Sequence, residues 1–203
     1  MRVLDQLEPR KVFFFFEELC AIPHGSGNTK AISDYCVKFA KDRGLEVHQD
    51  RLNNVVIVKP ATPGYEASPT VIVQGHLDMV TEKTPESSID FLKDGLELAI
   101  DGDFVYAKGT TLGGDDGIAV AMALAVLDSD DLEHPRLECL FTVDEETGMD
   151  GAVGFDASGL QGKRLLNIDS EEEGILTVSC AGGAHADVHI EMTPNECALS
   201  SAE

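Results

Sequence analysis

Basic residues are scarce in this sequence. Lys and Arg number 15 against 37 Asp and Glu in 203 residues, so the formal net charge is −22. Such a balance repels phosphate backbones and anionic lipid surfaces, and we therefore expect no nucleic acid and no membrane among the partners. The surplus carboxylates either form a solubilising surface or gather in part around cations, and the charge total leaves both interpretations open.

Paired cysteines and long hydrophobic runs are also lacking. The five cysteines show no CxxC spacing, which argues against a disulfide framework and against a thiolate zinc site. The apolar run FFFF at 13–16 is far too short to span a bilayer, and no apolar stretch follows the basic residues of the start. With 43% hydrophobic residues available for a core, the sequence predicts a soluble, globular, cytoplasmic protein.

Apolar residues at helical spacing predict three helices. The first lies between Pro9 and Ile22, and the second runs from about Asn28 to Arg43. The third, at 117–127, is Ala-rich and apolar nearly all round, which is typical of a helix packed against a sheet.

Five apolar runs predict strands. LEVHQ at 45–49 and VVIVK at 55–59 predict a hairpin around an Asn-Asn turn. TVIVQ at 70–74, LECLFTV at 137–143 and RLLNI at 164–168 are expected as neighbouring central strands. Strands that alternate with helices predict an α/β fold in three layers, with ligand chemistry at the carboxyl ends of the strands.

The pattern changes after Gly174. ILTVSC at 175–180 and ADVHIEM at 186–192 predict two further strands that open a second domain. We place the boundary near residue 181, so that residues 1–180 form the first domain and 181–203 the start of the second or a tail.

A histidine and an aspartate follow the run at 70–74. If the extended conformation continues, alternation puts His76 and Asp78 on the same side. A metal-bound imidazole commonly donates its other N–H to a carboxylate, so the pair suits a ligand and the group that orients it. Taken alone, a His and an Asp two residues apart occur more often in an unrelated surface loop.

Further carboxylates lie in a glycine-rich loop at 109–117 and after the predicted strands at 137–143 and 164–168. The loop GTTLGGDDG carries Asp115 and Asp116 ahead of a helix, and it lacks the Gly-Lys-Ser/Thr ending of a phosphate-binding loop. Capping of the helix explains one such aspartate equally well. Glu145 and Glu146 follow the run at 137–143 and Asp169 follows RLLNI, so that one carboxylate can hold a cation while its neighbour handles a proton.

Taken together, an imidazole and several carboxylates follow three separate apolar strands. Chance capping does not predict that arrangement. Nitrogen and oxygen ligands without thiolate suit zinc, manganese or cobalt in a hydrolytic site. Two such ions would polarise a carbonyl and lower the pKa of a bound water toward neutrality.

At these residues the sequence resembles the M20 metallopeptidase family, in its aminoacyl-histidine dipeptidase branch. The resemblance runs from the first helix to about Gly183. Its motifs occur in the same order and spacing: EELCAIPHGSGN, VIVQGHLDMV, GTTLGGDDGIAVAMALAVL, EETGMDGA, NIDSEEEG and CAGG. The resemblance implies that 1–180 is the N-terminal part of a three-layer, zinc-peptidase-like catalytic domain and that 181–203 begins an α+β lid domain.

The resemblance also implies a set of metal ligands. His76 and Asp169 would bind one of two divalent ions, Glu146 the other, and Asp115 would bridge them. The metal would be zinc, with manganese or cobalt as alternatives. The peptide bond between Asp115 and Asp116 would be cis.

In the same pattern Asp78 and Glu145 are the catalytic residues. Asp78 would orient His76, and Glu145 would take a proton from the attacking water and pass it to the leaving amine. The implied activity is hydrolysis of unblocked dipeptides, Xaa-His among them, in a homodimer formed through the lid. Alternatives are a tripeptidase, an amidohydrolase of N-acyl amino acids, and an inactive fragment that binds metal.

The family pattern completes its second metal site with a histidine from later in a longer chain. No residue of these 203 matches that histidine, so we expect this stretch alone to show little or no hydrolysis. His185 and His189 alternate in a strand-like run and are the first candidates for a substitute, although exposed strand histidines explain them better.

Overall fold

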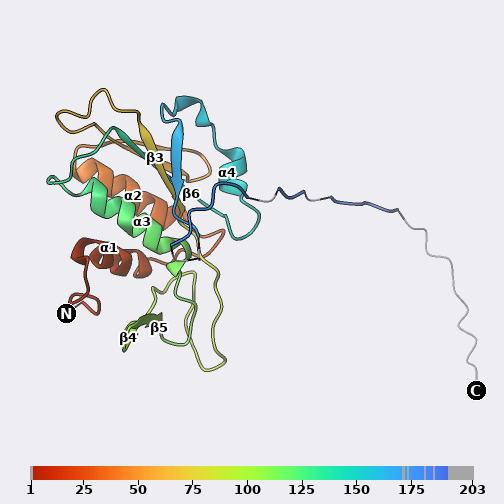
Figure 1. Ribbon diagram of the computed structural model, residues 1–203. Coiled ribbons are helices and arrows are strands. Elements are labelled where there is room, and N and C mark those ends of the chain that lie inside the picture. The colour runs from red at the N-terminus through yellow and green to blue at the C-terminus, as the bar shows by residue number, and fades with distance from the viewer. Residues whose placement is uncertain (1, 171, 173, 181, 185, 192–203) are drawn as a thin grey trace, which may run out of the picture. The chain divides into compact units, whose positions relative to one another are not determined.

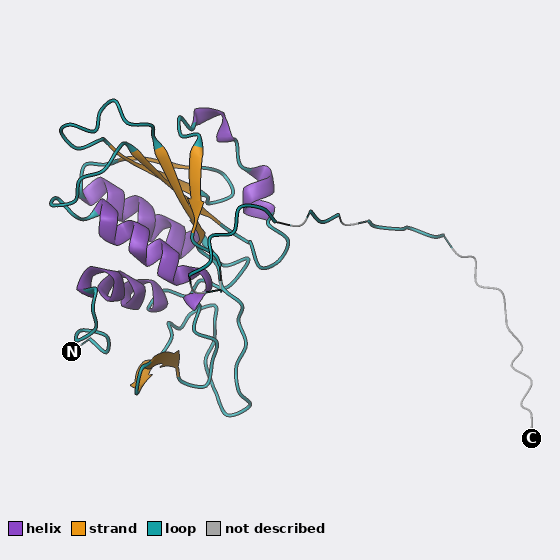
Figure 2. Ribbon diagram, viewed as in Figure 1, coloured by secondary structure: helices purple, strands orange, loops and turns teal. Residues whose placement is uncertain are grey.

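The structure is a computed structural model that describes residues 2–170, 172, 174–180, 182–184 and 186–191. The chain divides into two units, Met1–Glu171 and Glu172–Glu203. All the helices and strands of the described residues belong to the first unit (Figures 1 and 2). Among these residues, no helix is both long and apolar enough to span a membrane.

The sheet of the first unit has five strands in the order β1-β2-β6-β3-β7. Along the chain they are β1 Glu46–Gln49, β2 Val55–Lys59, β3 Val71–His76, β6 Leu137–Thr142 and β7 Arg164–Asn167. β3 runs parallel to β6 and to β7, whereas β1, β2 and β6 pair antiparallel. The expected hairpin at β1 and β2 is confirmed, and Asn53 in its turn has a positive φ of 79°.

Helices cover one face of this sheet. The helices are α1 Arg10–Cys20, α2 Lys30–Asp42 and α3 Gly114–Leu127. In Figure 1, α2 and α3 lie against the strands and α1 packs beside α3. Apolar side chains of the helices and of β2 and β6 form the main core there, with Phe141 fully buried.

A second layer of short helices lies over the opposite face. It consists of α4 Asp150–Gly154 and a 3₁₀ turn, η1 Ala157–Gly159. Phe155 and Leu160 from this segment pack on a smaller apolar cluster of β2, β3 and β6. The chain is therefore an α/β sheet with helical cover, as predicted.

Parts of the fold differ from the expectation. The strand from RLLNI is an edge strand among the described residues, since β7 pairs only with β3, and Leu165 and Leu166 are 52% and 57% exposed. An apolar run predicts burial but not what covers it. A hairpin of β4 Leu98–Asp101 and β5 Phe104–Ala107, around a Gly-Asp turn, was not expected.

The two runs expected as strands after Gly174 form no strand over their described residues. A strand needs a neighbour to accept and donate its ladder hydrogen bonds, and no described residue pairs with either run. The predicted domain boundary near residue 181 stays a prediction.

Gly151 offers a test of how α4 is fixed to the end of β6. A Cβ added there would lie 2.2 Å from the carbonyl oxygen and 2.7 Å from the nitrogen of Val143. Because both are backbone atoms, Gly151→Ala should destabilise the protein by about 1–3 kcal/mol, the usual cost of overpacking. Gly159→Ala is the matched control, since no atom lies within 4 Å of its added Cβ. Denaturant unfolding of both variants checks this, and equal stabilities would contradict it.

Candidate metal centre

The centre is built at the carboxyl end of β3, where His76 is the last residue. Its side chain is 1% exposed. Nδ1 lies 3.0 Å from the backbone carbonyl oxygen of Asp78 and 3.4 Å from the carboxylate of that residue. Nε2 lies 3.0 Å from Oδ1 of Asp115. Nδ1–H therefore donates toward Asp78, and Nε2 faces the carboxylates that could share a cation with it.

Asp78 holds several parts of the site at once. Its carboxylate accepts the Ser26 hydroxyl at 2.7 Å, the Glu145 N–H at 3.0 Å and the Glu146 N–H at 3.3 Å. Burial raises the pKa of Asp78, but hydrogen bonds from His76, Ser26 and the Glu145 amide outweigh burial and lower that pKa to about 2. The carboxylate is thus charged and fully engaged.

Two neighbouring aspartates at the start of α3 point to different partners. Gly113, which precedes the helix, has a φ of 67°, and neither Asp115 nor Asp116 has helical dihedral angles. The peptide bond between them is cis, as the resemblance implied. The side chain of Asp115 is 57% exposed and faces His76. Asp116 is buried, and its Oδ2 accepts the backbone N–H of His76 at 3.1 Å.

Two groups of residues are arranged so that each could hold a metal ion. One consists of His76, Asp115 and Glu146, and the other of His76, Asp116 and Asp169. Within each group the ligand atoms all lie within 4.8 Å of one another. The four residues predicted as ligands therefore lie in two groups that share His76.

The grouping differs from the expected one in two respects. His76, expected on one ion, is common to both groups, whereas Asp115, expected as the bridge, is in only one of them. Asp116, which was not expected as a ligand, accompanies Asp169, while Asp115 accompanies Glu146. The adjacent acids of GTTLGGDDG were the available signal, but sequence cannot say which of two neighbours turns inward. The roles of the individual ligands remain predictions.

The charges of the centre favour a bound cation. Burial together with the charge of Asp169 raises the pKa of Asp116 to about 8. Burial and the charge of Asp115 likewise raise the pKa of Glu146. Crowded carboxylates of this kind resist ionisation unless positive charge is near. Oxygen and imidazole donors without thiolate fit zinc, manganese or cobalt.

Glu145 belongs to neither group but lies beside the centre. With Asp169 it lines a hollow of about 220 Å³ over the face of the sheet opposite α3, with Thr142 and Phe155 also in its wall. Its backbone is fixed by Asp78 while its carboxylate forms no hydrogen bond to another described residue. That placement suits a group that exchanges protons with a bound molecule.

His185 and His189 are the late histidines that the sequence offered as substitute ligands. His185 lies outside the described residues. His189 belongs to the second unit and is exposed. The metal-binding groups found among the described residues do not include His189.

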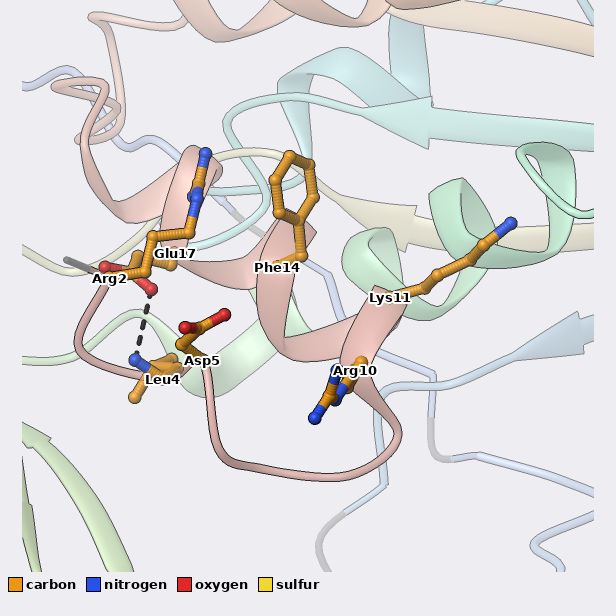
Figure 3. Close-up of a pocket in the computed structure, with 7 residues that line it drawn as sticks. All are labelled: Arg2, Leu4, Asp5, Arg10, Lys11, Phe14 and Glu17. Atoms are coloured by element: carbon orange, nitrogen blue, oxygen red, sulfur yellow. Dashed lines mark hydrogen bonds between the residues drawn. The ribbon is translucent and has the colours of Figure 1, made fainter.

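A separate hollow of about 230 Å³ lies at the start of the chain, around α1 (Figure 3). Arg2, Arg10 and Lys11 line it, but they pair with Glu18, Glu8 and Asp128 respectively. The backbone N–H of Leu4 donates to Glu17 at its edge. Because its cations are already neutralised, this hollow has no evident anion-binding character.

Fold and centre together define an α/β protein with a candidate metal site at the carboxyl ends of parallel strands. Comparison with known proteins narrows this class. Residues 72–197 match the peptidase family M20/M25/M40. The chain belongs to that family.

Relatives match over most of this chain. It is 46% identical over 183 residues to the cytosol non-specific dipeptidase of Escherichia coli (strain K12). The aligned region covers 90% of this chain and 38% of that protein. The structure of aminoacylhistidine dipeptidase from Vibrio alginolyticus matches with a TM-score of 0.82 and 46% identity, over 84% of this chain and 35% of that one.

A more distant match is aminopeptidase PepT from Bacillus cereus ATCC 10987. Its TM-score is 0.66 at 25% identity, over 80% of this chain and 43% of that one. The chain spans less than two fifths of the length of the curated relatives it matches, 38% and 36%.

The charge state of His76 makes the stability of the metal-free protein depend on pH. Burial lowers the pKa of His76, but the hydrogen bond and charge of Asp78, with Asp116 and Asp115, raise it from 6.5 to about 10. A raised folded-state pKa gives stability that is complete below pH 6.5 and is lost as the pH rises toward 10. The raised pKa of Asp116 acts in the same direction, from 3.8 to about 8.

We therefore expect the unfolding free energy of metal-free protein, held in a chelator, to fall between pH 6.5 and 10. His76→Gln should flatten the part of this profile that lies above pH 8, where Asp116 contributes little. Denaturant titrations at a series of pH values measure it. A profile with the same slope in both proteins would contradict the assignment.

Proposed function

We propose that the protein containing this chain hydrolyses unblocked dipeptides at a centre of two divalent metal ions. The observation that carries the proposal is the convergence of His76, Asp115, Glu146 and Asp169 in two overlapping groups. The 46% identity to a protein named as a dipeptidase supports the substrate class. The more distant match to an aminopeptidase, at 25% identity, makes aminopeptidase activity on other peptides, such as tripeptides, the second candidate.

His76 and Asp169 would hold one ion, Glu146 the other, and Asp115 would lie between them. Asp116, which shares the second group, keeps β3 in place through the His76 amide. When bound, such ions supply Lewis acidity that activates water and polarises the scissile carbonyl. Zinc fits the donor set, and manganese and cobalt fit it as well.

Glu145 is the proposed general base. Its carboxylate accepts a proton from the attacking water at a side-chain oxygen and returns that proton to the nitrogen of the leaving amine. Asp78 keeps this residue in place through the Glu145 N–H and holds the ring of His76 from its Nδ1 side. A cytoplasmic location and a homodimer formed through a lid domain complete the proposal.

Replacing Glu145 tests the proton transfer. In the protein containing this chain, Glu145→Gln should lower dipeptide turnover on the order of a thousandfold or more, because an amide cannot accept the proton of the water. Metal content should stay nearly unchanged, since Glu145 is in neither ligand group. Glu66→Gln is the control, because Glu66 is exposed and is in neither ligand group. Turnover within tenfold of the unchanged protein would exclude Glu145 as the base.

Replacing Asp115 tests the metal site itself. Asp115→Ala removes the carboxylate that faces Nε2 of His76, so bound metal should fall below that of the unchanged protein after dialysis. Elemental analysis measures it. Asp101→Ala, at the last residue of β4, removes an exposed carboxylate that is in neither group and should leave the metal content unchanged. Full metal content in Asp115→Ala would show that the ligand set is wrong.

A further inference from the structure

The segment 22–28 runs alongside the chain just after β3. Gly25 forms a parallel bridge with Met79. The Met79 N–H donates to the carbonyl of His24 at 3.2 Å, and the Ser26 N–H donates to the carbonyl of Met79 at 3.3 Å. A Cβ on Gly25 would lie 2.4 Å from Cγ2 of Thr81, so the two stretches approach closely. The backbone of Ser26 is therefore held in register with the residues that follow His76.

From this position the segment contacts Asp78 of the centre and Asp144, the residue before Glu145. The Ser26 hydroxyl donates to Oδ2 of Asp78 at 2.7 Å. The Gly27 N–H donates to Oδ1 of Asp144 at 2.7 Å, immediately before Glu145. These contacts link the start of the chain to the ends of both β3 and β6.

Ser26 makes the shortest of the hydrogen bonds to the Asp78 carboxylate. Oδ2 is shared with the Glu146 N–H, which lies farther away at 3.3 Å, while the Glu145 N–H occupies Oδ1. A hydrogen bond to a charged acceptor is stronger than a neutral one and fixes the rotation of the carboxylate. Without the hydroxyl, Oδ2 would keep only its long contact, and the carboxylate would be less firmly oriented toward both His76 and the Glu145–Glu146 turn.

We propose that Ser26 is a positioning residue of the metal centre, which acts through the Asp78 carboxylate to hold His76 and the Glu146 backbone in place for metal binding. The inference rests on the proposed function, because it assumes that His76 and Glu146 are ligands. It assigns Ser26 no contact with substrate. Its role belongs to the outer hydrogen-bond partners that tune metal ligands.

Metal affinity, measured by competition with a chromophoric chelator, provides the test. Replacing a direct outer partner of a ligand weakens binding by roughly 10–100-fold, so Asp78→Asn should fall in that range. Ser26 acts one step further out, and Ser26→Ala should weaken Zn²⁺ or Co²⁺ binding by about 3–10-fold. The visible absorption of the Co²⁺ protein should change with it. Ser26→Thr keeps the hydroxyl and should bind within about twofold of the unchanged protein.

Ser33→Ala is the matched control. Its hydroxyl donates a bond of the same 2.7 Å length to the carbonyl of Asn53, and neither residue is in a metal-binding group. It should lower thermal stability without weakening metal binding. If Ser33→Ala weakens metal binding as much as Ser26→Ala does, the effect is general destabilisation and the proposal is overturned.

A double-mutant cycle shows whether Ser26 acts through Asp78. Ser26→Ala should add no more than about twofold in an Asp78→Asn background, since coupled residues are not additive. Fully additive losses would overturn the proposal. His76→Ala separates this outcome from failure of the proposed function. If it abolishes tight metal binding while Ser26→Ala has no effect, only the Ser26 role is wrong, whereas unchanged binding in His76→Ala overturns both.

Discussion

The hydrogen bonding of the buried Asp78 carboxylate is the interaction on which the centre depends. It is surrounded by donors from three separate parts of the chain: the Ser26 hydroxyl, the imidazole of His76 and the amides of the turn after β6. A buried charge is tolerated only when its hydrogen-bonding capacity is met. The donors stabilise the charge of Asp78, and Asp78 in turn holds the three parts of the chain that supply those donors in one arrangement.

The sheet supplies the second constraint. β3 and β6 are parallel, with His76 opposite Thr142, so the residues that follow both strands emerge at one edge. Gly75 lets α3 approach that edge, since a Cβ there would lie 2.6 Å from Oδ2 of Asp116. Asp116 can then bond the His76 backbone and still share a group with Asp169. A side chain at position 75 would push apart two elements that the centre needs together.

Much of this was accessible from sequence for a physical reason. Helical and alternating patterns report burial, and burial is what places α1, α2, α3 and the strands, including the hairpin of β1 and β2. His76, Glu145, Glu146 and Asp169 were predicted because each closely follows an apolar run, and Asp115 because it lies in a glycine-rich loop ahead of a helix. The edge position of β7 was not predicted, because the hydrophobicity of a strand does not show whether a second strand pairs with it. The bond from Ser26 to Asp78 spans 52 residues and has no local signal at all.

Among the residues that the structure describes, β7 is the last strand of the sheet, and its outer edge has a consequence for how copies of the chain behave together. An uncovered strand presents unpaired backbone donors and acceptors, and here it also carries exposed Leu165 and Leu166. Such an edge is a template for adding a strand from a neighbouring molecule. The net charge of −22 opposes that approach, because like-charged molecules repel at a distance. Salt at 0.1 M screens this repulsion beyond about 10 Å. Added salt should therefore make association of copies through this edge easier.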